Sequence, residues 1–250
     1  MTLKELYKTA DYKDSHGMLF HGDCLEIMKD IEDESIDMIL CDLPYGTTQN
    51  KWDSIIPLDT LWIQYKRIIK PNGAICLFAQ CPFDKVLGAS NLPMLKYEWI
   101  WEKEAGTGFL NAKKMPLKNT ENILVFYKKL PIYNPQMREG KPYKITQGGD
   151  SFNYGGYHRV VTENNGERYP VNLIKFNRDK NTAHPTQKPV ALLEYLIKTY
   201  TNEGDIVLDN CMGSGSTGVA CINTNRRFIG IELDEKYFNV AKERMENHHV

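Results

Sequence analysis

The sequence lacks the features that identify several classes of protein. No apolar run approaches the roughly 18 residues of a membrane-spanning helix, so no transmembrane segment is expected. Residues 1–8 contain neither an apolar block nor a small-residue cleavage site, and we expect no signal peptide. Internal repeats and low-complexity tracts are also missing, and hydrophobic residues make up 42% of the chain, which excludes fibrous and disordered classes. The 250 residues fit one globular domain with a substantial insertion.

Cysteine is sparse and shows no paired spacing. The six cysteines are Cys24, Cys41, Cys76, Cys81, Cys211 and Cys221. No two of them form a Cys-x-x-Cys pair, and no cluster of His, Cys and carboxylate residues has the spacing of metal ligands. We therefore expect buried, reduced thiols, and neither a disulfide framework nor a metal site.

Net charge is almost absent, because 31 basic residues face 32 acidic ones, but the balance varies along the chain. Residues 103–188 carry a net charge of +8, whereas residues 1–102 carry −6 and residues 189–250 carry −3. Aromatic residues are interleaved with the basic ones in this middle third, which favours contact with nucleic acid. The alternative is a merely solvated loop region. The candidate anchors, most of which we expect to contact phosphates, are Arg138, Lys141, Lys144, Arg159 and Arg168.

Two segments with alternating strand and helix patterns flank this middle third. In the first, residues 36–42 form a short apolar run that ends in an acid, and residues 58–70 have a helical spacing that Pro71-Asn72-Gly73 ends. Further strands are expected at 74–79, 97–101 and 122–127.

The second segment repeats the alternation. Helices are expected at 191–200, 213–223 and 235–247, and strands at 205–209 and 227–232. Such alternation predicts an α/β fold with a mostly parallel sheet and helices on both faces. Residues 131–183, between the segments, are rich in Gly, Asn, Tyr and Pro and have little periodicity, which predicts a small irregular insertion.

A glycine-rich loop follows one expected strand. Asp209 ends this strand, and Gly213 and Gly215 would let the backbone turn tightly and approach a ligand at the start of the next helix. Glu232 ends the following strand, where a carboxylate can accept both hydroxyl protons of a ribose. The combination predicts binding of a nucleoside-type ligand. Taken alone, the loop leaves a dinucleotide-binding oxidoreductase open.

The tetrapeptide Asp42-Leu43-Pro44-Tyr45 lies where another apolar strand ends. An exocyclic amine of a nucleobase is a poor nucleophile, because its lone pair is delocalised into the ring. The Asp42 carboxylate and the Leu43 carbonyl could accept its two N–H groups and hold the lone pair toward an electrophile. Pro44 would fix the turn, and Tyr45 offers a ring on which a base can stack. The alternative is an Asp N-cap with a core tyrosine.

These motifs together resemble the amino-group DNA methyltransferases that use S-adenosyl-L-methionine. Their catalytic motif (D/N/S)-P-P-(Y/F/W) is similar to residues 42–45, and their D-P-F-x-G-S-G-T-T loop is similar to residues 209–217. Their H-P-T-Q-K-P segment stands unchanged at 184–189, their G-D-C-L segment stands at 22–25, and Glu232 matches their ribose acid. The catalytic motif precedes the cofactor loop, which is the circularly permuted β-group order.

The resemblance implies a Rossmann-like class I methyltransferase fold with a mostly parallel seven-stranded sheet. Residues 1–130 and 184–250 would form the catalytic domain, and 131–183 would be a target-recognition insertion. Catalysis would fall to Asp42, Leu43, Pro44 and Tyr45. The cofactor would be held by Asp23, Thr186, Lys188, Asp209, Gly213, Gly215 and Glu232. Of these, Asp23 would bind the adenine amine, Glu232 the ribose, and Thr186 and Lys188 the cofactor carboxylate.

The chain departs from the family pattern at two places. Leu43 replaces the first proline of the catalytic motif, but its carbonyl remains. Asn210-Cys211 replace a Pro-Phe pair that packs beside the cofactor in the family.

The implied activity is site-specific methylation of the N6 amine of adenine in double-stranded DNA, by base flipping and direct in-line transfer. The resemblance further implies a restriction-modification setting, a cytoplasmic location in a prokaryotic or phage-infected cell, no metal, and a homodimer as one form of assembly.

Methylation of cytosine N4 is the nearest alternative, although the family tends to carry Ser at the position of Asp42 for cytosine. An RNA methyltransferase, a nicotinamide-dependent oxidoreductase and a catalytically silent DNA-binding module are further alternatives. Methylation of cytosine C5 is rejected, because Cys81-Pro82 reverses the order of the required Pro-Cys signature.

Overall fold

The structure is a computed structural model that describes residues 1–46, 55–151, 155–180 and 187–247, with the side chains of 146–160 excluded. The chain forms two compact units. The larger one comprises residues 1–134 and 172–250, and the smaller one comprises residues 135–171.

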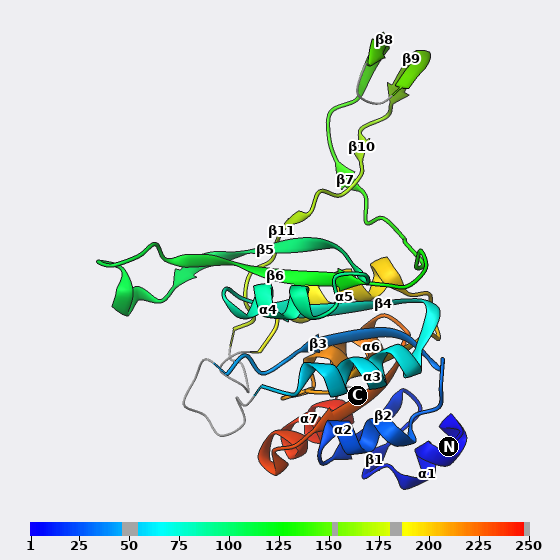
Figure 1. The fold of residues 1–250 in the computed structure, drawn as a ribbon, viewed down its shortest axis with the longest axis vertical. Coiled ribbons are helices and arrows are strands. Elements are labelled where there is room, and N and C mark those ends of the chain that lie inside the picture. Colours follow the sequence, from blue (N-terminus) through cyan, green and yellow to red (C-terminus); the bar gives the residue numbers. More distant parts are fainter. Residues whose placement is uncertain (47–54, 152–154, 181–186, 248–250) are drawn as a thin grey trace. The chain divides into compact units, whose positions relative to one another are not determined.

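The larger unit is built on one sheet, which has nine strands among the described residues, in the order β1-β2-β13-β12-β3-β4-β6-β5-β11 (Figure 1). The strands are β1 (Tyr12–Lys13), β2 (Gly17–His21), β3 (Ile36–Asp42), β4 (Ile69–Ala79), β5 (Leu95–Thr107), β6 (Lys118–Phe126), β11 (Leu173–Lys175), β12 (Ile206–Asp209) and β13 (Arg227–Glu232). Strand pairs are parallel from β2 through to β4, and β6 runs antiparallel to both β4 and β5. The expected seven-stranded, mostly parallel sheet is therefore present, and the short strands β1 and β11 extend its two edges.

Helices cover both faces of this sheet, as the alternating pattern predicts (Figure 1). They are α1 (Leu3–Thr9), α2 (Cys24–Ile27), α3 (Leu58–Ile68), α4 (Phe83–Ser90), α5 (Val190–Tyr200), α6 (Ser216–Asn223) and α7 (Glu235–Asn247), with 3-10 turns at Met28–Asp30 and Phe109–Asn111. Helices α1 to α4 share one core with Ile39 and Cys41 of β3, and α5 to α7 share the other core with Met38 and Leu40. Because successive strand residues point to opposite faces, one apolar strand serves both cores.

The expected end of the 58–70 helix differs from the structure. Pro71-Asn72-Gly73 does not separate helix from strand, because β4 already begins at Ile69. The three residues lie in an irregularity of β4: Ile36 pairs with Ile69, whereas Met38 pairs with Ala74. A proline lacks the N–H of a regular ladder, so it is tolerated at such an irregularity.

The smaller unit consists of two antiparallel strand pairs, so the expectation of an irregular insertion is wrong in this part. The pairs are β7 (Arg138–Glu139) with β10 (Glu167–Arg168), and β8 (Tyr143–Ser151) with β9 (Gly155–Asn164). β-Branched residues in β8 and β9 favour strands even where alternation is weak. The unit is also shorter than the expected 131–183, because β11 pairs with β5 and the Asn134 amide donates to the Thr199 carbonyl.

All six cysteines are free; Cys81 is exposed and Cys211 is partly buried, while the other four are buried as expected. In the described part of the chain, no helix is both long and apolar enough to cross a membrane.

Asp37, near the start of β3, connects this strand to β4 and β12, which leads to a prediction about stability. This carboxylate of β3 accepts hydrogen bonds from Lys70 Nζ of β4 (2.6 Å) and from the Ile206 amide of β12 (3.0 Å). Its loss would leave the ammonium and the amide without this partner, so Asp37→Ala should lower the free energy of unfolding by about 2 kcal/mol. Urea denaturation measures this change. The control Asp33→Ala removes an exposed ion pair with Arg67 and should cost about 1 kcal/mol or less; equal losses in the two variants would contradict the bridging role of Asp37.

Candidate active site

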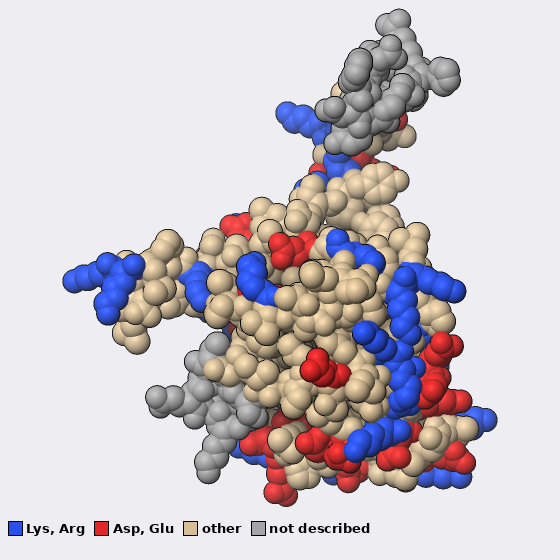
Figure 2. All heavy atoms as spheres, in the orientation of Figure 1, with Lys and Arg blue, Asp and Glu red and all other residues tan. Residues whose placement is uncertain are grey.

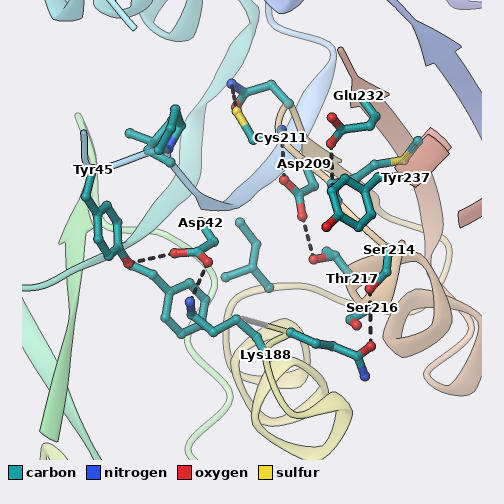
Figure 3. Close-up of a pocket in the computed structure, with 18 of the residues that line it drawn as sticks. Asp42, Tyr45, Lys188, Asp209, Cys211, Ser214, Ser216, Thr217, Glu232 and Tyr237 are labelled. Carbon is teal, nitrogen blue, oxygen red and sulfur yellow. Dashed lines mark hydrogen bonds and ion pairs between the residues drawn. The ribbon is translucent and has the colours of Figure 1, made fainter. Parts of the chain in front are cut away.

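The catalytic tetrapeptide and the glycine-rich loop meet because the strands that precede them are neighbours. β3 and β12 are parallel, with Ile39 opposite Leu208, so Asp42 and Asp209 leave the sheet at the same edge. A cavity of about 560 Å³ opens at this edge. In Figure 3, Asp42, Tyr45 and Lys188 form one group in the cavity, and Glu232 and Tyr237 lie in another.

Gly213 and Glu232 shape the side of the cavity that the sequence assigns to a nucleoside. Gly213 has a φ of +52°, and a Cβ placed on it would meet no atom within 4 Å, so its backbone faces open space. Its amide donates to Glu232 Oε2 (2.8 Å), while Glu232 Oε1 accepts from the Asp234 amide (2.8 Å). Burial raises the pKa of Glu232, and these amides oppose that shift. Each oxygen keeps a second lone pair with which it can accept a ribose hydroxyl.

Asp23 adds a second carboxylate to the same side. It is the N-cap of α2, and its Oδ1 accepts from the amides of Leu25 (2.7 Å) and Glu26 (3.3 Å). Leu233 and Tyr237 supply apolar surface nearby in the lining. Two partly satisfied carboxylates, an open glycine backbone and an aromatic side chain fit the expected S-adenosylmethionine.

Asp209 holds the loop in shape. It is 4% exposed, and its oxygens accept from the Cys211 amide (3.1 Å) and from Thr217 Oγ1 (2.6 Å). Burial raises its pKa to about 6. Gly215, also expected to contact the cofactor, does not line the cavity. A Cβ on Gly215 would lie 2.9 Å from Ala241 Cβ, so glycine here lets α6 begin close to α7.

A buried cluster of charges surrounds the catalytic tetrapeptide. Asp42 accepts from Tyr45 Oη (2.6 Å) and from Lys188 Nζ, and Lys188 also pairs with Glu121 (3.1 Å). Glu121, only 3% exposed, pairs with Lys103 (2.6 Å), and its Oε1 lies 3.0 Å from Tyr45 Oη as an alternative acceptor for the single hydroxyl proton. We call Asp42, Tyr45, Lys103, Glu121 and Lys188 the charge cluster. Every one of its residues lines the cavity.

The charges of this cluster are coupled. Burial raises the pKa of Asp42, and the Glu121 carboxylate adds to this effect while the Lys188 ammonium opposes it. Burial also works against ionisation of Glu121, but the ammonium groups of Lys188 and Lys103 lower its pKa to about 2. Glu121 therefore stays charged, and it keeps Lys188 in place beside Asp42.

Lys188 makes contacts that the sequence-based expectation did not include. The resemblance assigns it to the cofactor carboxylate, which stays a prediction; its ammonium lies between Asp42 and Glu121 and over the Phe78 ring, 5.0 Å from the centroid. Thr186, the other residue expected there, lies outside the described residues. Gln187, between the two, accepts from Ser214 Oγ (3.2 Å) and so ties this segment to the glycine-rich loop.

The tetrapeptide itself lines the cavity as expected. The Tyr45 ring stacks on Phe83, with the centroids 5.2 Å apart, so one face of the ring is already packed. Burial raises the pKa of Tyr45 well above its ordinary value, and the two neighbouring carboxylates add to this effect. Its hydroxyl therefore keeps its single proton, which it can donate either to Asp42 or to Glu121.

Several residues of the site have no role in the sequence-based prediction. They are Lys103, Glu121, Gln187, Tyr237 and Arg244. Arg244, from α7, donates to the Ser214 carbonyl (2.6 Å) and so fixes the glycine-rich loop. Glu121 carries one usable signal, because it is an acid directly before the strand expected at 122–127.

The expected DNA anchors all fall in the smaller unit. Arg138 donates to the Tyr169 carbonyl, and Arg168 binds the Lys141 carbonyl and stacks on the Tyr143 ring. Lys144 pairs with Glu163 at the surface (3.2 Å). Lys141 is exposed, and the side chain of Arg159 is among those that the structure does not describe. The two described arginines thus also hold this unit together.

The raised pKa of Asp209 predicts a pH-dependent stability. Its folded-state pKa of about 6 lies above the value of about 4 expected in the unfolded chain, so stability is lost as the pH rises from about 4 to about 6, and the loss is constant at higher pH. In Asp209→Asn this cost is absent. Between about pH 4 and about pH 7 the free energy of unfolding of the variant should therefore rise by about 2 kcal/mol relative to the wild type. Urea denaturation across this range measures the difference. The exposed Asp59→Asn serves as a control, and a constant wild-type-to-D209N difference would contradict the assignment.

Comparison with known proteins agrees with this site. Residues 36–243 match the family model of N6/N4 DNA methylases. The type II methyltransferase M.HpaI of Haemophilus parainfluenzae is 31% identical over 92% of this chain and 74% of its own length. The DNA adenine methyltransferase YhdJ of Escherichia coli K12 is 29% identical over 91% of this chain and 82% of its own.

A solved structure agrees as well. The M1.HpyAVI–SAM complex superposes with a TM-score of 0.63 at 29% identity, over 91% of this chain and 99% of the other. A nicotinamide-dependent oxidoreductase is thereby excluded. The chain belongs to the N6/N4 family of DNA methylases, and S-adenosylmethionine is its cofactor.

Proposed function

We propose that this protein methylates the N6 amine of adenine at a specific site in double-stranded DNA. The observation that carries the proposal is the Asp42 carboxylate, which lines the cavity and is held there by Lys188 and Tyr45. A carboxylate that accepts an N–H of the exocyclic amine favours its rehybridisation and frees its lone pair for attack. Relatives whose names describe adenine methylation, such as YhdJ, support the same choice of base.

The chain's own residues supply positioning and hydrogen bonds. The base must leave the duplex at a cost of a few kcal/mol before Asp42 and the Leu43 carbonyl can accept its amine hydrogens. Bound S-adenosylmethionine supplies an electrophilic methyl group on a sulfonium. Pro44 and Tyr45 limit the orientations of the base, which favours transfer by proximity. Each Asp42 oxygen has a further lone pair, so Tyr45 and Lys188 can stay bound.

Lys188 and Glu121 adjust the acceptor strength of Asp42. An unpaired carboxylate in this cavity would tend to become protonated, because burial raises its pKa. A protonated Asp42 would have one acceptor fewer. The Lys188 ammonium opposes protonation, and Glu121 fixes that ammonium through a second ion pair.

We further propose that residues 135–171 contribute to target recognition, with phosphate contacts from exposed side chains such as Lys141 and Lys144. The unit carries five Lys and Arg residues and folds as a separate strand unit, which supports this role, while its four acidic residues leave it a net charge of only +1. We also propose that the protein forms a homodimer. We propose further that it acts in a restriction-modification setting in the cytoplasm of a prokaryotic or phage-infected cell.

Asp42→Ala tests the catalytic assignment. The variant should lose at least about 10³-fold in kcat on unmethylated plasmid DNA, because no other carboxylate would take over the acceptor. Its affinity for S-adenosylmethionine, measured by calorimetry, should stay within about twofold, because Asp42 lies in the other group of the cavity. Mass spectrometry of nucleosides from wild-type reactions should give N6-methyladenine.

Asp59→Ala, which removes an exposed carboxylate of α3, is the matched control and should keep full activity. A product of N4-methylcytosine would assign the protein to the other activity of its family. Substantial turnover by Asp42→Ala would remove the proposed role of this carboxylate.

Glu232→Gln tests the nucleoside side of the cavity. Glutamine keeps one acceptor for the loop amides but loses the second oxygen and the charge, so S-adenosylmethionine and S-adenosylhomocysteine should both bind about tenfold more weakly. Calorimetry with each compound measures this. Glu235→Gln, on the exposed side of α7, is the control. Unchanged affinities in Glu232→Gln would refute the ribose role.

A further inference from the structure

The hairpin formed by β5 and β6 ends in a tip whose large apolar side chains are exposed to solvent. The two strands pair from Leu95 opposite Phe126 to Thr107 opposite Lys118, and residues 108–117 connect them. Figure 1 shows the pair running on beyond the ends of β3 and β4. We call residues 108–117 the hairpin tip.

The hairpin tip is ordered by its own hydrogen bonds. The Asn111 amide donates to the Gly108 carbonyl (2.9 Å), and the Met115 amide donates to the Asn111 carbonyl (3.0 Å). At its base, Thr107 Oγ1 donates to the Lys118 carbonyl (3.1 Å). The tip is thus a defined shape, which lowers the entropy that it would lose on binding.

Large apolar side chains at the tip are exposed to solvent. Phe109 is 76% exposed and Leu110 is 86% exposed, and both lie within three residues of the end of β5. Met115 (51%) and Leu117 (46%) are also exposed, on the other arm of the tip. Several large exposed apolar side chains in one short segment indicate a surface that becomes buried in a complex.

The charge around this apolar surface indicates the partner. Residues 105–120 contain Lys113, Lys114 and Lys118 and no acidic residue. Figure 2 shows basic side chains at the far end of this projection, with no acidic side chain beside them on the visible face. Among the described residues, neither Lys113 nor Lys114 has a carboxylate partner. Apolar residues flanked by free cations suit a nucleic acid, which has both a base stack and phosphates.

The hairpin also begins inside the active site. Lys103 and Thr107 of β5 and Glu121 of β6 all line the cavity. At about 3.3 Å per strand residue, Phe109 and Leu110 lie within roughly 10 Å of Thr107. A duplex whose target base enters the cavity would therefore pass close to the tip.

We propose that Phe109 and Leu110 enter the space that the target base leaves in the DNA stack, while Lys113 and Lys114 contact the adjoining phosphates. This inference rests on the proposed action on double-stranded DNA. An apolar side chain in the gap replaces part of the lost stacking and slows the return of the base. The tip thus stabilises the extruded state, and Asp42 acts on the base once it is in the cavity.

Phe109→Ala/Leu110→Ala tests the inference on duplex oligonucleotides that carry the site found by sequencing of wild-type-methylated plasmid DNA. On a fully paired duplex, kcat/KM should fall by about tenfold or more, because the gap stays unfilled. On the same duplex with an abasic site opposite the target adenine, extrusion is easier, so the loss should shrink to about threefold or less. With 2-aminopurine at the target position, the fluorescence increase on binding should be smaller for the variant than for the wild type.

Ile63→Ala/Leu92→Ala, which removes two apolar side chains that are each 64% exposed on other elements, should match the wild type in all three measurements. S-adenosylmethionine affinity should be unchanged in both variants, which verifies their folding.

An equal loss of kcat/KM by the tip variant on paired and abasic duplexes, or no loss on either, would overturn the inference. So would a wild-type dimer that the tip variant converts to a monomer in light scattering, since the tip would then be an interface between copies. Failure of the wild type to produce N6-methyladenine would instead overturn the proposed function.

Discussion

Parallel pairing of β3 with β12 is the constraint on which the active site depends. Both strands must end at the same edge of the sheet, so the tetrapeptide after β3 and the glycine-rich loop after β12 face one cavity. The two motifs are more than 160 residues apart, and their order in the chain has no influence on this result. Asp37 strengthens the same pairing from below through the Ile206 amide. A permuted sequence can thus keep the same site geometry, because adjacency in the sheet and not in the chain defines it.

The charge cluster shows how the protein keeps an acid functional in a largely enclosed site. Two carboxylates and two ammonium groups balance one another among Asp42, Glu121, Lys103 and Lys188. Each buried ion carries a desolvation cost that only close pairing offsets, so removal of one member leaves a neighbour uncompensated. Lys188 pairs with Asp42 directly, while Lys103 is connected to it through Glu121. The cluster therefore connects β5, β6 and Lys188 to the Asp42 carboxylate, for which we propose the catalytic role.

Much of the fold and the cavity could be predicted from sequence, because the signals were local. Strand periodicity, the glycine-rich loop and the tetrapeptide each lie within about ten neighbouring residues, and parallel topology then brings them together. Partners joined only by the fold could not be predicted. Arg244 reaches the Ser214 carbonyl from another helix, and Lys188 forms ion pairs with Glu121 and Asp42, which lie far from it in the chain. The strands of the smaller unit were missed because its glycines and asparagines obscure the alternation.

The β5–β6 hairpin joins two environments that the rest of the sheet keeps apart. Near the cavity, its side chains are buried charges: Lys103 is 8% exposed and Glu121 is 3% exposed. A few residues further on, the same strands end in apolar groups that face solvent, such as Leu110. The pairing of the two strands is irregular between Glu102 and Thr107, which lies between these two environments. Such an irregularity bends a ribbon locally and leaves part of one strand out of the ladder. The tip can therefore follow its own surroundings, while regular pairing of Trp101 with Glu121 and of Glu102 with Thr120 keeps the buried charges beside the cavity.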